Sequence, residues 1–369
     1  MVAVLRELKN KDASVEIRFW CDYKFAPQAK RIVHNFEPSV RVDRIVAGKL
    51  RRYHTLPWWR QLLRPFSIVL PNIRDLFLVV CGFLQSMIKL IIWRPDVVFT
   101  KGGFVCLPVG FAAKLLGIPL VIHDSDAHPG LTNRILARFA TSIATGASLD
   151  NYPYPREISR YIGVPISDVF RPVTPERQAV LKKSIGVNSS RPLLVVTGGG
   201  LGAENINHAV AKCLDKLLEL SDVVLIAGTR QYDEMRALTP QNDDRFQLHA
   251  FIADNMVDYL GAADIVVTRA GATTILELAA LAKPSILIPS PYLSAGHQLK
   301  NAADLAKQDA VEVINEIELD ATPQLLVDMI TAILANKDRL GALSKNFHAL
   351  ARPHAARDMA DMIVAATKG

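Results

Sequence analysis

The chain has 369 residues, of which 50% are hydrophobic and 21% are charged, and its net charge is +7. This composition is too apolar for a disordered protein, and the length exceeds what one hydrophobic core usually organises, so two domains of roughly 150 to 200 residues are expected. The four cysteines lie far apart and form no C-x-x-C pair. That argues against a disulfide framework or a zinc site and fits the reducing cytosol.

The N-terminal part carries the positive charge, because residues 1–100 hold 17 Lys and Arg against 8 Asp and Glu. Seven of these bases fall within 41–64, a segment that also contains Tyr53, Trp58 and Trp59. Basic residues mixed with tryptophan suit an anionic membrane surface, where each positive charge contributes about 1 kcal/mol. We therefore expect peripheral membrane contact, with a solvated loop as the alternative. No nucleic-acid-binding pattern accompanies the charge, so a nucleic acid partner is not expected.

The sequence predicts neither a secretory signal nor a membrane span. Met1 leads into a stretch that alternates charged and apolar residues at helical spacing, which is unlike a signal peptide. The longest apolar run, 76–92, has 17 residues and includes Gln85, Ser86 and Lys89. A bilayer span needs about 20 residues, so this run is too short.

Short runs rich in Val and Ile alternate with segments of helical periodicity, which is typical of parallel-sheet α/β domains. The first series predicts strands at 15–20, 96–100 and 119–123, with a helix from about 107 to 116. A second series follows the proline-containing stretch 163–190. Its predicted strands are 192–197, 222–227, 246–249, 264–268 and 285–289. Two such series predict twin Rossmann-like domains.

Ligands in such sheets bind at the carboxyl ends of the strands, where three unusual segments of the second series stand. Glycines at 198–200 and at Gly202 open a helix after a strand, where the backbone can approach a phosphate; the same loop can also be a sharp structural corner. The next helix start carries Arg269, able to pair with a phosphate, and Glu277, able to accept both hydroxyls of a ribose. A third helix start supplies the amide of Gln298 for sugar hydroxyls. Together they predict a site for a nucleotide diphosphate sugar.

These segments resemble the MurG family of glycosyltransferases, whose C-terminal domain carries G-G-S-Q-G-A, R-x-G-A-x-T-x-x-E and H-Q-x-x-N-A in that order. Their counterparts in this chain are 198–203, 269–277 and 297–302. Segments of the N-terminal half are similar too, namely 94–105, 117–119 and 130–133. The resemblance implies an α/β protein with the GT-B fold, in which two Rossmann-like domains with parallel sheets face a cleft.

The resemblance also implies different binding roles for the two domains. Residues 1–163 would form the acceptor-binding, membrane-facing domain, and residues 164–345 would bind UDP-N-acetylglucosamine (UDP-GlcNAc). The C-terminal helix within 346–369 would pack back toward the first domain. The implied reaction transfers GlcNAc with inversion to lipid I, undecaprenyl-pyrophosphoryl-MurNAc-pentapeptide, to form lipid II at the cytoplasmic face of the membrane. No cofactor and no metal are implied.

The family pattern assigns roles to individual residues. Ile252 would offer backbone hydrogen bonds to uracil, Glu277 would hold the ribose and Gln298 would contact the sugar. The substrate-binding set that the resemblance implies is Asp126, Gly199, Gly200, Gly202, Ile252, Arg269, Ala272, Thr273, Glu277 and Gln298. Asp124 is the candidate catalytic base, since the attacking hydroxyl benefits from one. A structural cap of the loop at 130–133 is the alternative role for its carboxylate.

The chain departs from the family pattern at three places. The family opens with a strand and a G-G-x-G-G-H loop, whereas Met1 stands where the following helix begins, so the first strand and the candidate catalytic histidine are absent. A sheet without that strand would leave its neighbours unpaired. The family's H-E-Q-N reads His123-Asp-Ser-Asp126 here, which also resembles a D-x-D metal motif. The arginine of G-N-P-V-R is lost, because 163–167 reads Gly-Val-Pro-Ile-Ser.

Other functions remain open at this point. A different GT-B enzyme, such as a glycolipid synthase or a UDP-GlcNAc 2-epimerase, would use the same nucleotide motifs. A non-catalytic UDP-sugar-binding fragment is the alternative outside enzymes.

Overall fold

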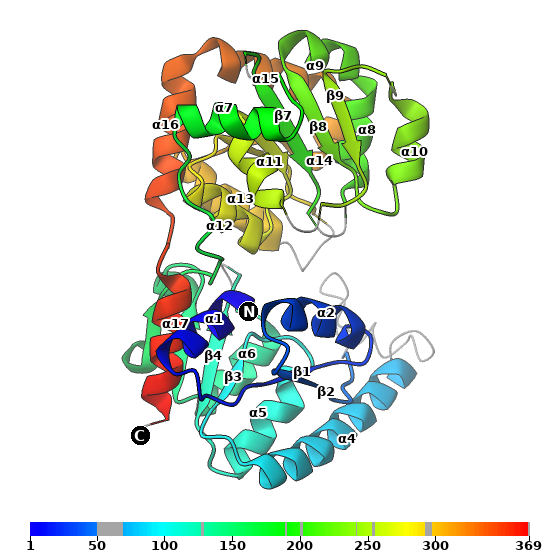
Figure 1. Cartoon of the computed structure of the whole chain (residues 1–369). Helices are drawn as coiled ribbons and strands as arrows, with labels where there is room; N and C mark the ends of the chain where they lie inside the picture. The colour runs from blue at the N-terminus through cyan, green and yellow to red at the C-terminus, as the bar shows by residue number, and fades with distance from the viewer. Residues whose placement is uncertain are drawn as a thin grey trace. The chain divides into compact units, whose positions relative to one another are not determined.

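The computed structural model describes residues 1–49, 69–126, 129–188, 190–199, 202–240, 242–252, 255–291 and 297–367. The chain divides into two compact units. Unit 1 is Met1–Ser167 with His354–Gly369, and unit 2 is Asp168–Pro353. The chain therefore leaves unit 1 after Ser167 and returns to it for its last helix (Figure 1). The assignment of acceptor and nucleotide binding to the two parts stays a prediction.

The described residues of unit 1 form two parallel sheets. In one of them β1 (Arg18–Cys21) pairs with β2 (Arg41–Arg44). The other has the order β3 (Val98–Thr100), β4 (Leu120–Asp124), β5 (Ser142–Thr145) and β6 (Ser159–Tyr161). The helices are α1 (Val2–Lys11), α2 (Ala26–Phe36), α4 (Leu70–Trp93), α5 (Cys106–Leu115), α6 (Leu131–Leu136) and α17 (Ala355–Ala366), with 3-10 turns at Ala137–Phe139, Leu149–Asn151 and Arg156–Ile158.

The sheet around β4 is covered on both faces. All residues of β4 are buried, as expected for a parallel strand between two helical layers. Leu120 and Ile122 pack with side chains of α4 and α5, while Val121 packs with side chains of α1 and α17. Because successive side chains of a strand point to opposite faces, α4 and α5 cover one face of this sheet and α1 and α17 cover the other.

Helix α4 is longer than the sequence predicts and has an unusual surface. The helix has 24 residues and, among the described residues, it is the one helix long and apolar enough to cross a membrane by length and composition. The length argument against a span, which rested on 76–92 alone, is therefore wrong. One face of α4 packs in unit 1 through Gly82, Ser86 and Leu90. Many apolar side chains of its other face are exposed.

In the part of unit 2 that the structure describes, six strands form one parallel sheet. Their order is β12 (Glu312–Val313), β11 (Ser285–Leu287), β10 (Ile265–Thr268), β7 (Leu193–Thr197), β8 (Asp222–Ile226) and β9 (Phe246–His249). The helices are α7 (Pro175–Ser184), α8 (Glu204–Lys212), α9 (Leu214–Leu220), α10 (Tyr232–Leu238), α11 (Met256–Ala262), α12 (Ala272–Ala280), α13 (His297–Lys307), α14 (Glu316–Ala321), α15 (Gln324–Ala335) and α16 (Lys337–Ala349). Two buried clusters, one on each face of the sheet, form the core.

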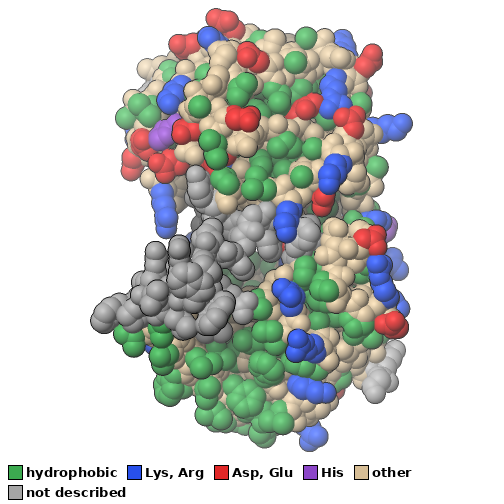
Figure 2. All heavy atoms as spheres, turned by 180° about the vertical axis from the view of Figure 1, so that it is seen from behind, with side chains coloured by type: hydrophobic (Ala, Val, Ile, Leu, Met, Phe, Trp, Pro, Cys, Tyr) green, Lys and Arg blue, Asp and Glu red, His purple; other side chains and the backbone are tan. Residues whose placement is uncertain are grey.

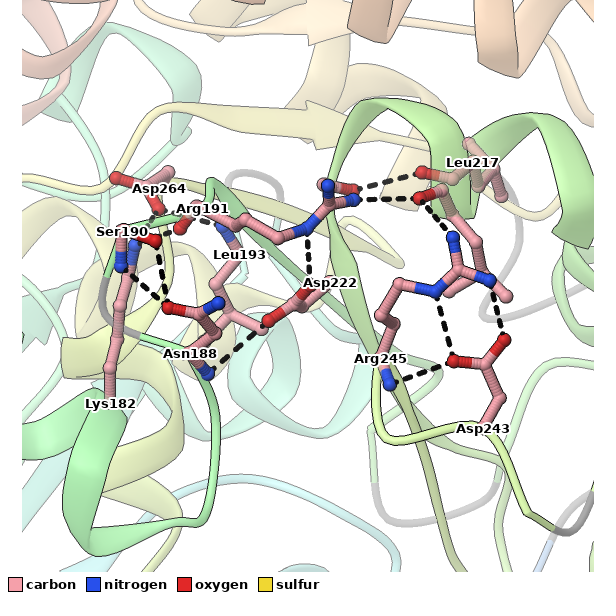
Figure 3. Close-up of polar contacts among 12 residues, drawn as sticks. Lys182, Asn188, Ser190, Arg191, Leu193, Leu217, Asp222, Asp243, Arg245 and Asp264 are labelled. Carbon is pink, nitrogen blue, oxygen red and sulfur yellow. Dashed lines mark hydrogen bonds and ion pairs between the residues drawn. The ribbon is translucent and has the colours of Figure 1, made fainter.

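Charged side chains fasten the amino ends of the central strands of unit 2 (Figure 3). Asp264, just before β10, accepts hydrogen bonds from Nζ of Lys182 at 2.6 Å and from the backbone N–H of Leu193 at 2.7 Å. The buried Asp222 accepts a 2.7 Å bond from Nε of Arg191. This network fixes β7, β8 and β10 at one end. The loops at their other, carboxyl ends carry the candidate site.

Candidate functional site

The glycine loop after β7 is a tight turn. Gly199 and Gly202 have φ of +73° and +74°, a conformation that favours glycine. A Cβ on Gly198 would lie 2.3 Å from the carbonyl carbon of Gly202, so no larger residue fits. The turn leads into α8, which begins at Glu204. Gly200 lies outside the described residues. The loop therefore needs its glycines for the turn itself, and its predicted contact with a phosphate is a separate claim.

Helix α12 begins with backbone N–H groups that no side chain caps. Gly271 is its N-cap residue and provides no side-chain hydrogen bond. Ala272 is partly exposed and Thr273 is exposed at the first turn. Uncapped N–H groups at a helix start, together with the helix dipole, stabilise an anion. This geometry is compatible with the predicted phosphate contact at the start of α12, which stays a prediction.

Glu277 lies on the same helix and is partly buried. Burial raises the pKa of its carboxyl to about 7, since the charged form loses its hydration. At neutral pH the group is therefore close to half-ionised. An ionised carboxylate accepts hydrogen bonds only, which is what two ribose hydroxyls require.

Arg269 is engaged within the protein. Its Nη2 forms an ion pair with the buried carboxylate of Glu316 at the start of α14, and its Nη1 donates to the carbonyl of Ile288 at 3.2 Å. Asn205 of α8 donates to the same Glu316 oxygen at 3.1 Å. Breaking a buried ion pair costs about 3 to 5 kcal/mol. The expected phosphate contact of Arg269 stays a prediction, and the structure gives this residue a second role as a link between β10, α8 and α14.

The third motif, on α13, contacts the second motif and the loop after β11. Oε1 of Gln298 accepts a 3.0 Å hydrogen bond from the N–H of Ser290, after β11. Asn301, on the same helix α13, donates to the carbonyl of Ala270 at 3.2 Å. Residues from β10, the loop after β11 and α13 are thus brought to one edge of the sheet. Ile252, after β9, is buried in the core beside α11 and α12. The burial of the Ile252 side chain does not test the expected backbone hydrogen bonds to uracil, which stay a prediction.

Asp124 ends β4 in unit 1 and is buried, with 3% of its surface exposed. Its Oδ2 accepts a 2.7 Å hydrogen bond from the hydroxyl of Tyr154. Burial raises the pKa of Asp124 to about 6, although hydrogen bonds from Tyr154 and Asn133 oppose the shift. A carboxylate with this pKa is mostly ionised at neutral pH and still basic enough to take a proton.

Two tyrosines, which the sequence reasoning did not single out, brace the loop after β4. Tyr152 donates its hydroxyl proton to the carbonyl of Asp126, and Tyr154 binds Asp124. Their rings stack with centroids 5.5 Å apart. The only sequence signal for them is the Tyr-Pro-Tyr run at 152–154.

The neighbours of Asp124 and Asp126 include a buried histidine, His123, and a partly buried lysine, Lys101. His123 is fully buried between the carbonyl of Gly163, 2.8 Å from Nε2, and Oγ of Ser125, 3.1 Å from Nδ1. Burial lowers its pKa to about 3, so His123 is neutral and structural. Burial also lowers the pKa of Lys101, while the charge of Asp126 acts in the opposite direction. Among the described residues, no group of three or more His, Cys, Asp or Glu side chains gathers as metal ligands would.

Two family models together match most of the chain. Residues 1–145 match the glycosyltransferase family 28 N-terminal domain, and residues 193–361 match the glycosyltransferase family 28 C-terminal domain. The chain belongs to glycosyltransferase family 28. The predicted family is thereby confirmed, and so is the prediction of a glycosyltransferase.

Two relatives of this family 28 enzyme carry the same name. It is 33% identical over 316 residues to the UDP-N-acetylglucosamine--N-acetylmuramyl-(pentapeptide) pyrophosphoryl-undecaprenol N-acetylglucosamine transferase of Clostridium kluyveri, a match that covers 84% of this chain and 80% of the relative. The protein of the same name from Acetivibrio thermocellus is 37% identical over 260 residues, covering 69% and 68% of the two chains.

Solved structures resemble the family 28 enzyme in fold. The MurG of Acinetobacter baumannii superposes with a TM-score of 0.73 at 23% identity, covering 99% of this chain and 94% of that one. A UDP-GlcNAc 2-epimerase from Neisseria meningitidis, solved with UDP-GlcNAc bound, gives a TM-score of 0.65 at 12% identity, with 99% and 96% covered. Both likenesses support the GT-B fold alone, and the predicted fold class of two Rossmann-like α/β domains is confirmed.

Proposed function

We propose that this enzyme transfers GlcNAc from UDP-GlcNAc to lipid I and so forms lipid II. The observation that carries the proposal is the similarity to relatives named for this reaction, at 33% identity over 84% of the chain. The uncapped start of α12 and the carboxylate of Glu277 on the same helix support a nucleotide diphosphate in unit 2. No cofactor is needed for this transfer.

In the proposed reaction the 4-hydroxyl of the muramyl sugar attacks C1 of GlcNAc and expels UDP with inversion. Asp124 takes the proton of the attacking hydroxyl, because its raised pKa of about 6 keeps it basic and mostly ionised at neutral pH. The N–H groups at the start of α12 stabilise the charge that develops on the leaving diphosphate. Glu277 holds the ribose, and Gln298 reads hydroxyls of the transferred sugar.

The release of UDP separates this proposal from its alternatives. With purified protein and UDP-GlcNAc we expect UDP to appear only when lipid I is added, at one UDP for each lipid II formed. UDP-GlcNAc consumed without an acceptor would instead support a 2-epimerase, whose fold the chain shares. A protein that binds UDP-GlcNAc but releases no UDP with lipid I would support a non-catalytic binder.

We further propose that unit 1 binds the cytoplasmic face of the membrane through α4. This contact would place unit 1 beside the membrane-bound acceptor, lipid I. The exposed apolar side chains of α4 recur every three or four residues and so share one face. They are Leu70, Ile73, Leu76, Phe77, Val80, Leu84, Ile88, Ile91 and Ile92, all at least half exposed. Figure 2 shows hydrophobic side chains gathered on unit 1. The buried residues of α4 are Asp75, Gly82, Ser86 and Leu90, so the helix also has a small-residue and apolar face that packs in unit 1. Trp58 and Trp59, the expected anchors, lie outside the described residues.

Replacing Phe77 and Ile88 together with glutamine is expected to reduce binding to vesicles of anionic lipid by about tenfold or more. Each exposed side chain that inserts into lipid contributes on the order of 1 to 2 kcal/mol. Co-sedimentation with vesicles measures the effect, and added salt should weaken the wild-type binding because part of it is screened Coulomb attraction. Leu238→Gln, at a residue 57% exposed on unit 2, is the matched control and should bind as wild type does. Equal binding of the double variant would contradict the role of α4.

A further inference from the structure

The carboxylate of Asp124 accepts hydrogen bonds from two separate segments of unit 1. The hydroxyl of Tyr154 donates to its Oδ2 at 2.7 Å. The side chain of Asn133 and the backbone N–H of Gly130, both at the amino end of α6, also donate to the carboxylate. An ionised carboxylate has about four acceptor positions, so these three donors leave about one for a further hydroxyl.

Tyr154 differs from the other two donors in its place in the chain. Gly130 and Asn133 belong to the loop that a capping carboxylate would hold, whereas Tyr154 lies 30 positions from Asp124, between the 3-10 turns Leu149–Asn151 and Arg156–Ile158. A cap of the loop at 130–133 needs only the donors of that loop. A capping role of Asp124 therefore does not explain the bond from Tyr154.

The ring of Tyr154 is fixed by its surroundings. It is buried in a small cluster with Ala137, Ile143 and Tyr152. The rings of Tyr152 and Tyr154 stack with centroids 5.5 Å apart and planes 18° apart, and the hydroxyl of Tyr152 is bonded to the backbone of Asp126. A donor held in this way can position a reacting group, because a misplacement of about 1 Å can cost two orders of magnitude in rate.

The hydroxyl of Tyr154 also favours the ionised form of Asp124. Burial and the charge of Asp124 raise the pKa of Tyr154 well above its ordinary value, so the hydroxyl keeps its proton and remains a donor. A donor to an ionised carboxylate lowers the pKa of that carboxylate. The bond from Tyr154 therefore opposes burial, which raises the pKa of Asp124 to about 6.

Other charged and titratable groups act on this cluster from the neighbouring elements. Asp126, in the same loop, raises the pKa of Asp124. The charge of Asp124 in turn raises the pKa of Tyr152, although burial is the larger cause. Further groups act on these residues or on their neighbours, namely the amino group of Met1, Lys101, His123, Arg134 and Tyr161. All of them remain when only the hydroxyl of Tyr154 is removed, so its effect can be measured separately.

We propose that Tyr154 is a positioning residue for GlcNAc transfer, whose hydroxyl holds the Asp124 carboxylate ionised and in one orientation and leaves an acceptor position for the attacking hydroxyl. This role rests on the proposed function, in which Asp124 is the base. Tyr154 neither gains nor loses a proton in the reaction. Tyr152 supports the same arrangement by holding the ring of Tyr154.

The test is Tyr154→Phe, which removes the hydroxyl and keeps the stacked ring. Carbon NMR with labelled aspartate carboxyl groups follows the titration of Asp124, whose signal is identified by its loss from Asp124→Asn. We expect the pKa of Asp124 to rise by on the order of one unit in Tyr154→Phe, because a donor to its ionised form is lost. Tyr152→Phe is the matched control. It removes a hydroxyl that bonds a backbone carbonyl, and it should leave the titration of Asp124 where the wild type has it.

The pH profile of kcat is a second readout, which a merely structural role would not move. The rise of kcat with pH should shift upward together with the pKa of Asp124. A shift of one unit from about 6 lowers the ionised fraction about fivefold at pH 6 and very little at pH 8, so the loss of kcat should be about fivefold greater at pH 6. KM for UDP-GlcNAc should stay at the wild-type value, because the proposed nucleotide site is in unit 2.

Two outcomes would overturn the proposal. One is an Asp124 titration that is the same in Tyr154→Phe and in the wild type, even if the variant melts at a lower temperature. The other is a shifted titration with an unshifted kcat profile. Failure of the proposed function is recognised separately, because it would appear in the wild type as a lack of GlcNAc transfer, whereas the NMR comparison needs no substrate.

A second measurement serves if Tyr154→Phe does not fold. The wild type and Tyr152→Phe are then produced with 3-fluorotyrosine in place of tyrosine. Its more acidic hydroxyl donates more strongly, so the pKa of Asp124 should fall in both proteins. An unchanged pKa of Asp124 would overturn the proposal.

Discussion

Asp124→Asn is expected to lower kcat for GlcNAc transfer by about two orders of magnitude or more, because an amide cannot take the proton of the attacking hydroxyl and a general base contributes about 10²- to 10⁴-fold. The asparagine can still bind the hydroxyl of Tyr154, which is 2.7 Å from the carboxylate in the wild type. Binding of UDP-GlcNAc should therefore change little. Steady-state rates with lipid I check the expectation.

The pH profile distinguishes a base from a structural cap. Wild-type kcat should rise as the pH passes about 6, the value to which burial raises the pKa of Asp124, and this limb should be absent from the variant. The stability of the folded wild type should instead fall as the pH rises over this range. A raised acid pKa favours the folded state fully below the ordinary value of 3.8, and this contribution is lost as the pH rises through about 6. At pH 8 the variant should thus be at least as stable as the wild type.

A control and a contrary outcome complete this experiment. Asp150→Asn removes an exposed carboxylate of the same unit, which forms an ion pair with the exposed Arg156 and accepts a hydrogen bond from Ser148, and it should keep wild-type kcat. If Asp124→Asn kept its kcat but melted at a clearly lower temperature, the carboxylate would be a cap of the loop at 130–133 and another group would be the base.

Glu277→Ala is expected to weaken UDP binding by about 10- to 100-fold, because losing hydrogen bonds to two ribose hydroxyls costs about 1 to 3 kcal/mol. Isothermal titration calorimetry measures the affinity. Burial raises the pKa of Glu277 to about 7, and only its ionised form accepts from both hydroxyls. Wild-type affinity for UDP should therefore increase from pH 6 to pH 8, with release of a proton on binding below pH 7.

The diphosphate of UDP also titrates near this range, so variants are compared at each pH. Glu277→Gln keeps the shape of the side chain and should lose the part of the pH dependence that comes from the carboxyl. Glu318→Gln changes an exposed glutamate of unit 2 and should follow the wild type throughout. Identical pH profiles for Glu277→Gln and the wild type would show that this carboxylate does not hold the ribose.

The sequence predicted the strands of unit 2 well because its signals are local. Strands such as β7 and β8 are continuous apolar runs buried on both faces, and the motifs stand directly after them. The short strands β5 and β6 carry no such run, and they were not predicted. Their pairing comes from the neighbouring strand, which sequence periodicity does not report.

The partners of site residues could not be predicted for a related reason. Arg269 and Glu316 are 47 positions apart, and nothing in either segment marks them as a pair. Tyr154 meets Asp124 from 30 positions away. Such contacts depend on how helices pack after the chain has folded. The charge state of Asp124 and Glu277, which decides their chemistry, depends on the same packing.

The two faces of α4 make different demands on the chain. On the buried face, a Cβ on Gly82 would lie 1.9 Å from the carbonyl oxygen of Val46, and Oγ of Ser86 is bonded to the carbonyl of Gly82 at 2.7 Å, so substitutions there disturb the fold. On the outer face, side chains such as Phe77 and Ile88 are 67% and 60% exposed and support nothing inside unit 1. Solubility can therefore be engineered on this helix independently of folding. A polar outer face would give a protein suited to crystallisation and calorimetry without detergent, with the candidate site residues left as they are.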